Sequence, residues 1–251
     1  MLKGFWKLTW VEFKVFVREP MGLVGTLATP VLLFIVFSRL LGRGGTDGAT
    51  DGGMGRPMPF NVAILAALMI AVNAVMSLVS IIAIYREGGI LKRLRATPLS
   101  PLTILCAQVL VKLVFTVVSL GLLVLAGKRM LPGAMQVPIV SFTLALLMGS
   151  VSILSLGFLI ASLVPTSRFA QPIGAVVLYP MVALSGLFVP IDRLPAGWRM
   201  VANALPTTHA VALMQGVWDR SGWSSQWEHV LALSVIFAVC SALSTRLFRW
   251  E

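Results

Sequence analysis

Acidic residues, histidine and cysteine are all scarce in this sequence. Its 251 residues include 9 Asp and Glu, 2 His and 2 Cys. The histidines, His209 and His229, have no cysteine or paired acid at ligand spacing, so they predict neither a metal site nor a catalytic one. Cys106 and Cys240 lie in apolar segments, which argues against a disulfide framework. The P-loop motif G-x-x-x-x-G-K-[ST] is missing too, which excludes ATP binding by that route.

Apolar residues dominate what remains. They make up 58% of the chain, and charged residues only 12%, which is too apolar for one water-soluble domain. Six apolar runs are long enough to cross a hydrocarbon core, which takes roughly 20 residues of helix. We therefore predict an all-α polytopic membrane protein with a single transmembrane domain over residues 1–251. The predicted spans are residues 21–41, 60–84, 102–126, 138–164, 169–189 and 230–247.

Positive charge gathers in short connections between these spans. The clustered cations are Lys3, Lys7, Lys14 and Arg18 before the first span and Arg86, Lys92, Arg93 and Arg95 after the second. By the positive-inside rule this places both termini in the cytoplasm of a multi-pass protein, which we expect in a bacterial inner membrane. The formal net charge of +11 is thus explained by topology, and we predict no binding of nucleic acid.

Residues 1–20 have the pattern of an amphipathic helix. The cationic side chains share one face, and the opposite face carries Phe5, Trp6, Trp10, Phe13 and Phe16. We predict an interfacial helix whose aromatic face lies at headgroup depth and whose cationic face meets anionic lipid. It serves either as a plain membrane anchor or as a lever that moves with the bundle, and the sequence leaves both open.

Residues 85–101 form a short basic connection between two apolar segments. Gly88 and Gly89 permit a sharp change of direction, and the pattern of residues 90–96 predicts two helical turns with an apolar ridge and a charged rim. Such a helix suits a groove on a partner protein. The alternative is an ordinary basic inside loop, which the topology rule already explains.

Polar residues recur on one face of the second and third spans. They are Asn73, Ser77 and Ser80 in the second span, and Gln108, Lys112, Thr116 and Ser119 in the third. These faces line a substrate path or serve only as helix contacts. No Asp or Glu lies in any predicted span to pair with Lys112, so it either snorkels to the cytoplasmic surface or faces water. Of these two we favour snorkelling.

Residues 190–229 are too long for a turn. Residues 198–205 and 209–218 have helical, partly apolar patterns, and we predict short external helices that dip back toward the membrane. Four tryptophans, at 198, 218, 223 and 227, suggest an interfacial belt over them. The segment would cap an exit or act as a purely structural lid. In the fourth span, Gly149, Ser152 and Leu156 form a small-residue face that predicts helix packing.

Two segments carry a resemblance to a known family. Residues 85–100, Y-R-E-G-G-I-L-K-R-L-R-A-T-P-L-S, and residues 186–195, G-L-F-V-P-I-D-R-L-P, with N-A-L-P-T-T-H at 203–209, are similar to membrane subunits of type-2 ABC exporters. Permeases of the daunorubicin-resistance and nodulation-factor kinds look most alike. The order of an amphipathic N-terminal helix and six spans agrees with that family.

The resemblance implies an exporter permease, and not an enzyme itself. It would work as a homodimer, or with a paralogous permease, and bind two copies of a separate ABC ATP-binding subunit that holds the ATP and Mg²⁺. The substrate would be an amphiphile such as a drug, lipid or glycoconjugate. The implied contacts with the ATPase are Arg86, Glu87, Gly88, Gly89, Ile90, Leu91, Lys92, Arg93, Leu94, Arg95, Thr97 and Pro98. The implied external gate contains Phe188, Pro190, Asp192, Pro195, Pro206 and His209.

An ion-coupled secondary transporter that works without an ATPase is the alternative. Such a transporter would normally carry acidic or histidine residues inside its spans, and the predicted spans contain none.

Overall fold

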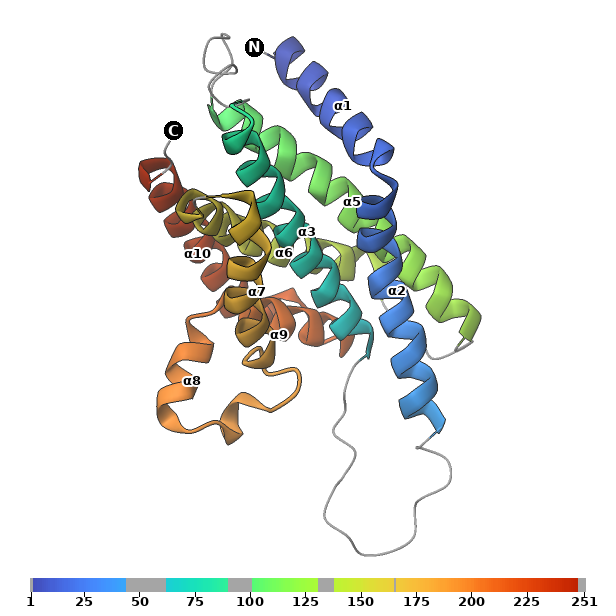
Figure 1. Cartoon of the computed structure of the whole chain (residues 1–251). Coiled ribbons are helices and arrows are strands. Elements are labelled where there is room, and N and C mark those ends of the chain that lie inside the picture. The colour runs from blue at the N-terminus through green and yellow to red at the C-terminus, as the bar shows by residue number, and fades with distance from the viewer. Residues whose placement is uncertain (1, 44–61, 90–100, 131–137, 165, 248–251) are drawn as a thin grey trace, which may run out of the picture.

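The computed structural model describes residues 2–43, 62–89, 101–130, 138–164 and 166–247, and every regular element in these ranges is helical (Figure 1). The helices are α1 (Leu2–Arg18), α2 (Pro20–Arg43), α3 (Val62–Glu87), α5 (Pro101–Met130), α6 (Ile139–Leu163), α7 (Ser167–Ala183), α8 (Ala196–Asn203), α9 (Pro206–Trp218) and α10 (Trp227–Leu247), with single 3-10 turns η1 (Ile191–Arg193) and η2 (Trp223–Gln226). The all-α prediction is confirmed for these residues.

Five of the helices are long and apolar enough to cross a membrane. They are α2, α3, α5, α6 and α10, and each coincides with a predicted span to within about one helical turn. The prediction of a helix over 169–189 is wrong at its far end. Helix α7 stops at Ala183, where the Leu184 N–H bonds to the Pro180 carbonyl, and Gly186 then takes φ 82°. Glycine adopts a positive φ at little energetic cost. The helix can therefore end here, and the rest of the apolar run forms a turn.

Helices α3 and α6 form the centre of the bundle. About 61% of the candidate span in α3 and 67% of that in α6 is buried inside the protein, against 11% for α2 and 17% for α10. Ile64, Leu68 and Leu78 of α3 and Ile153 and Leu154 of α6 are almost fully buried. The outer helices therefore present apolar faces to their surroundings, as expected of helices in lipid.

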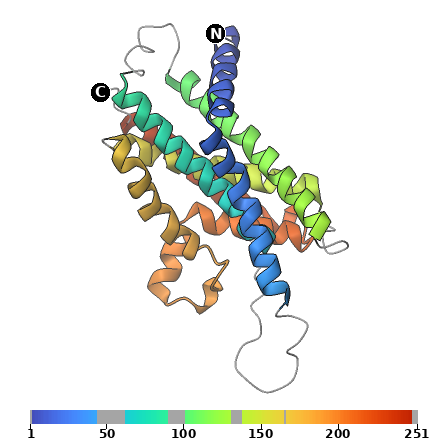
Figure 2. The same ribbon diagram turned by 45° about the vertical axis from the view of Figure 1, so that its right-hand side comes forward.

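Helix α1 packs along α5 (Figures 1 and 2). Phe13 stacks on Phe115 of α5 with ring centroids 5.3 Å apart, and the Phe16 ring lies tilted against Phe115 at 4.4 Å. Only Trp6 and Trp10 keep the exposed aromatic surface that the sequence predicts for the whole face, with 61% and 59% of each accessible. The aromatic face is thus divided between the protein and its surroundings, which corrects the predicted single membrane-facing stripe.

The first residues of α1 and the last of α10 lie at the same end of the bundle as the end of α3, in both views (Figures 1 and 2). Helices α8 and α9 lie toward the other end, and α9 crosses the bundle beneath α6 and α10. Their bounds agree with the two helices predicted within 190–229. The small-residue face of α6 is confirmed as a packing surface, because Gly149 lies against Ala210 of α9 and the Ser152 hydroxyl donates to the Leu233 carbonyl at 3.1 Å.

Candidate functional site

The predicted ATPase-contacting segment begins at the last turn of α3, where Arg86 points back into the bundle. Its guanidinium donates to the carbonyls of Val164 at 2.7 Å and Ala161 at 3.1 Å. These carbonyls end α6, where the last turn has no intrahelical donors and the helix dipole is negative. Arg86 therefore caps the C-terminus of α6.

Glu87 caps the N-terminus of the next helix, α7. Its carboxylate accepts a hydrogen bond from the Ser167 N–H at 2.9 Å and another from the Ser167 hydroxyl. Ser167 is the first residue of α7, and the N-cap residue Thr166 makes no side-chain cap of its own. A carboxylate at a helix N-terminus satisfies free N–H groups and meets the positive end of the dipole. Two consecutive residues of α3 thus hold the turn between α6 and α7, and we call Arg86 and Glu87 the α3 clamp.

The chain turns sharply just after the α3 clamp. The N–H groups of Gly88 and Gly89 bond to the carbonyls of Ile84 and Arg86, and Gly89 takes φ 65°. The predicted change of direction at the glycine pair is confirmed, since this φ is one that side-chain-bearing residues rarely adopt. The remaining predicted contacts, Ile90, Leu91, Lys92, Arg93, Leu94, Arg95, Thr97 and Pro98, lie outside the described residues.

Lys112 joins the two predicted polar faces inside the protein. Its ammonium donates to the Ser77 hydroxyl at 2.6 Å and lies 4.1 Å from the centre of the Phe16 ring. Only 2% of the residue is exposed, so the favoured snorkelling interpretation is wrong. A buried ammonium needs hydrogen bonds and negative charge nearby. Here it receives a hydroxyl, an aromatic face and the charges of Glu12 and Glu19.

Glu12 is the functional residue that the sequence analysis missed. It is 5% exposed on α1, and the Tyr85 hydroxyl donates to its carboxylate, 2.8 Å from each oxygen. Glu12 lies outside every predicted span, so a search for acids within the spans could not find it. Its place on the same face of α1 as Phe5 and Phe16, at helical spacing, was the available signal. The buried Glu12 and Lys112 and the half-buried Ser77 and Tyr85 are here named the polar junction, which ties α1 to α3 and α5.

The other predicted path residues flank this junction without forming an open passage. Thr116 and Ser119 are buried, and Asn73 and Ser80 are half-buried. The hydroxyls of Ser80, Thr116 and Ser119 have no hydrogen-bond partner among the described residues. The two faces therefore meet inside the protein, with hydroxyl groups left for another partner.

The six predicted gate residues fall into two groups. Phe188, Pro190, Asp192 and Pro195 lie on the exposed stretch from the end of α7 to the start of α8, and the Asp192 carbonyl accepts a hydrogen bond from Arg199 at 2.6 Å. Pro206 and His209 belong to α9. Pro206 is buried at the first turn, and His209 Nδ1 lies 3.0 Å from His229 Nδ1 of α10.

The histidine pair fastens α9 to its neighbours. The second nitrogen of His209 lies 2.9 Å from the Asn203 carbonyl, and the neighbouring Thr207 hydroxyl donates to the Met181 carbonyl of α7 at 2.9 Å. Within the described ranges no group of three or more His, Cys, Asp or Glu is placed to hold a metal ion. The pair is thus explained by hydrogen bonding between helices.

Comparison with known proteins identifies the family. The chain belongs to the ABC-2 type transporter family, whose pattern matches residues 3–218, so the predicted resemblance is confirmed. It is 28% identical to the inner membrane transport permease YhhJ of Escherichia coli (strain K12) over 166 residues, which are 65% of this chain and 44% of that protein. It is also 28% identical to nodulation protein J of Rhizobium leguminosarum bv. viciae over 95 residues, 38% of this chain and 37% of that one. The match spans less than half the length of either relative.

Proposed function

We propose that this chain is the membrane-spanning permease subunit of an ATP-driven exporter. It pairs as a homodimer or with a paralogous permease, and binds two copies of a separate ABC ATP-binding subunit that carries the ATP and Mg²⁺. It moves an amphiphilic substrate out of the cytoplasm across the bacterial inner membrane. Membership of the ABC-2 type transporter family supports this proposal.

The observation that carries the proposal is the position of the α3 clamp. The segment proposed to bind the ATPase follows directly on Arg86 and Glu87, which hold the ends of α6 and α7. A push on this segment therefore reaches three helices at once rather than bending one loop. Nucleotide can shift the bundle only if the partner contacts its two states differently, and the α3 clamp offers a contact that joins the moving parts.

The proposed topology has six spans with both termini in the cytoplasm. Helix α7 is the proposed span in addition to the five candidate helices, and it is fifth in chain order. Its 17 residues extend about 25 Å at 1.5 Å per residue. The apolar turn that ends in Leu187 then completes the crossing. Helices α8 and α9 form the external re-entrant segment, and the groups around Phe188 and His209 form the external gate.

The proposed substrate path runs along the facing polar surfaces of α3 and α5. Its members are Asn73, Ser77, Ser80, Lys112, Thr116 and Ser119. Hydroxyls without partners at Ser80, Thr116 and Ser119 support this assignment, because buried polar groups are normally satisfied and these would gain a partner when the path opens.

Co-purification tests the proposed function. A tagged chain expressed in its native host should retain an ABC ATPase, and the double substitution Leu91→Glu and Leu94→Glu should abolish that retention by placing charge on the apolar ridge. Met200→Glu on α8, at a residue that is 77% exposed, is the matched control and should retain the ATPase. Retention by the double variant, or transport in liposomes driven by an ion gradient without any ATPase, would refute the proposal.

A further inference from the structure

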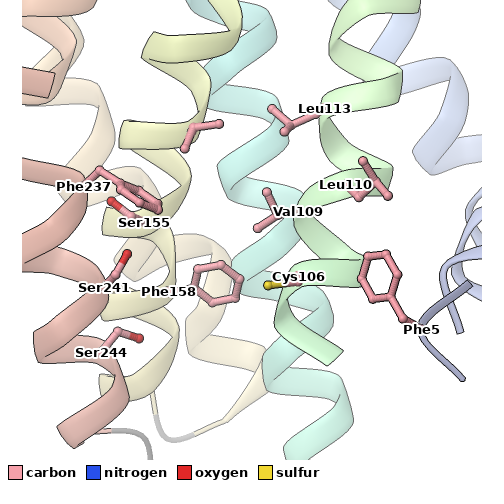
Figure 3. A pocket seen from close by; sticks show the side chains of 11 residues that line it. Phe5, Cys106, Val109, Leu110, Leu113, Ser155, Phe158, Phe237, Ser241 and Ser244 are labelled. Atoms are coloured by element: carbon pink, nitrogen blue, oxygen red, sulfur yellow. The ribbon is translucent and has the colours of Figure 1, made fainter. Parts of the chain in front are cut away.

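An apolar cleft of about 430 Å³ lies among α5, α6 and α10 (Figure 3). Helix α6 forms its floor and contacts both α5 and α10, which form its walls. The ring of Phe5, from α1, lies at its border beside Leu110. None of the six proposed path residues lines it.

The walls of the cleft are almost wholly carbon. Val109, Leu113 and Phe158 line its middle, and its polar groups are the Cys106 thiol and the hydroxyls of Ser155, Ser241 and Ser244. Water in such a cavity would lack the two to four polar partners that it needs, and apolar cavities of this kind take apolar ligands. The three lining helices are candidate membrane spans, so the available apolar molecule is lipid.

Two of the hydroxyls lie toward one end of the cleft. Ser241 and Ser244 lie one turn apart on the last two turns of α10, whereas Ser155 of α6 lies nearer to Phe237 (Figure 3). That end of the bundle is the one where α5 begins, close to a membrane surface if the helices span. The cleft thus has a polar mouth near one bilayer surface and an apolar interior directed toward the bilayer centre.

A second cavity of about 530 Å³ continues the first. The two share Val151 and Phe237, and the second extends along α6 and α10 to Trp223. Phe237 is 43% exposed and stands between them. An extended flexible molecule that enters at the serines therefore finds an apolar route past Phe237.

We propose that this cleft binds one acyl chain of a membrane phospholipid, with the ester oxygens next to Ser241 and Ser244. A methylene chain needs no hydrogen bonds, whereas an extended peptide would bury backbone groups that three hydroxyls cannot satisfy. This lipid site is separate from the proposed path and does not rest on transport.

The bound chain also touches α1 through Phe5. Because Glu12 of the same helix belongs to the polar junction, α1 is held on one side by polar contacts and on the other by lipid. Removal of the lipid should therefore loosen the start of α1, and addition of phospholipid should raise the thermal stability of the chain.

A photoreactive phospholipid tests the site directly. The full-length chain is placed in nanodiscs of phosphatidylethanolamine and phosphatidylglycerol that contain a phosphatidylcholine with a diazirine midway along one acyl chain, then irradiated, digested and mapped by mass spectrometry. Adducts should concentrate on peptides with Val109, Phe158 and Phe237, several-fold above peptides with the exposed residue Val176 of α7. Val109→Trp should fill the cleft and remove most of this enrichment. Val117→Trp, at an exposed position of α5 outside the cleft, should preserve it.

Modification of Cys106 gives a second readout in the unaltered chain. Cys106 is exposed in the cleft, whereas Cys240 is 7% exposed and does not line it. Phospholipid added to the delipidated chain in detergent should slow alkylation of Cys106 by a small maleimide several-fold and leave Cys240 unchanged. Adducts spread evenly over the lipid-facing surface, or Cys106 protection that persists without lipid and follows dimer formation, would overturn the proposal.

Discussion

The two ends of this bundle are fastened by different forces. Where α3 ends, charged groups make the connections, through the α3 clamp and the buried Glu12 and Lys112. Where α9 meets α6, α7 and α10, the connections are neutral. They are the hydrogen bond from the Thr207 hydroxyl to the Met181 carbonyl, the contact between the His209 and His229 imidazoles, and the close approach of Gly149 to Ala210.

This difference predicts different sensitivities. A buried or capping charge interacts over distance and costs much when its partner is lost, so the first end should respond to substitutions that change charge. Close packing responds to volume, so the second should respond to substitutions that change shape. Charge contacts suit a helix end that must move under an external force, and close packing suits one that must keep its shape.

Removal of the Glu12 charge should have the largest effect. Glu12→Leu removes the acceptor of the Tyr85 hydroxyl and an acid whose charge acts on the buried ammonium of Lys112. The two losses together should cost about 3 kcal/mol. We expect a correspondingly lower midpoint of thermal unfolding in detergent. The double variant Glu12→Leu with Lys112→Met should recover most of the loss, since it leaves no unmatched charge. Equal instability of the single and double variants would show that Glu12 stabilises through Tyr85 and packing and not through the charge of Lys112.

Overpacking at the end where α9 meets α6 should have the second-largest effect on stability. A Cβ at Gly149 would lie 2.8 Å from the Ala210 Cβ, so Gly149→Ala should cost about 2 kcal/mol by overpacking. Gly121→Ala on α5 is the control, because nothing lies within 4 Å of its added methyl group, and it should be neutral or slightly stabilising. Similar melting curves for the two variants would show that this end is not sensitive to added side-chain volume.

Loss of the α6 cap should have a smaller effect on stability. Arg86→Met keeps the aliphatic length but removes the donors to Val164 and Ala161, which should cost about 1.5 kcal/mol because the site is partly solvated. Amide hydrogen exchange should rise in the last turn of α6 and the first of α7, and stay unchanged in α9. Uniform exchange over the whole chain would instead indicate global loosening.

Thr207→Val should have the smallest effect. It removes one neutral hydrogen bond to Met181 with little change of shape, which is worth about 1 kcal/mol. Thr143→Val is the matched control, because the exposed Thr143 hydroxyl donates only to the Ile139 carbonyl of its own helix. Differential scanning fluorimetry of the pair should separate them by a few degrees, and a larger loss at Thr143 would contradict this ranking.

Much of the fold is readable from the sequence because lipid-spanning helices are selected by length and hydropathy. The bounds of α3, α5 and α6 follow from their apolar runs, and the turn at Gly89 from its glycine pair. The end of α7 was not readable in this way. Leu187, Phe188 and Val189 are as apolar in a turn as in a helix, so composition cannot mark where the helix stops.

For the candidate site, the sequence predicts the types of residue but not the contacts between them. The polar faces of α3 and α5 were predicted, but Glu12, whose charge acts on Lys112, stands 100 positions earlier on a helix assigned to the membrane surface. Likewise Arg86 and Glu87 have patterns that suggest an external partner. Their contacts with Ala161, Val164 and Ser167 require the α6–α7 turn to return to the end of α3, and no local pattern contains that information.

We propose that the end of α3 and the α6–α7 turn move as one body when the proposed ATPase acts. The direct test is a distance between spin labels at Gly88→Cys and Arg168→Cys, in a chain whose two native cysteines are replaced by serine, assembled with its co-purified ATPase. The distance from position 88 to position 168 within one chain should be the same without nucleotide and with ATP trapped, while the distance between the two copies of position 88 changes. A change in the distance from 88 to 168 on ATP binding would contradict the claim.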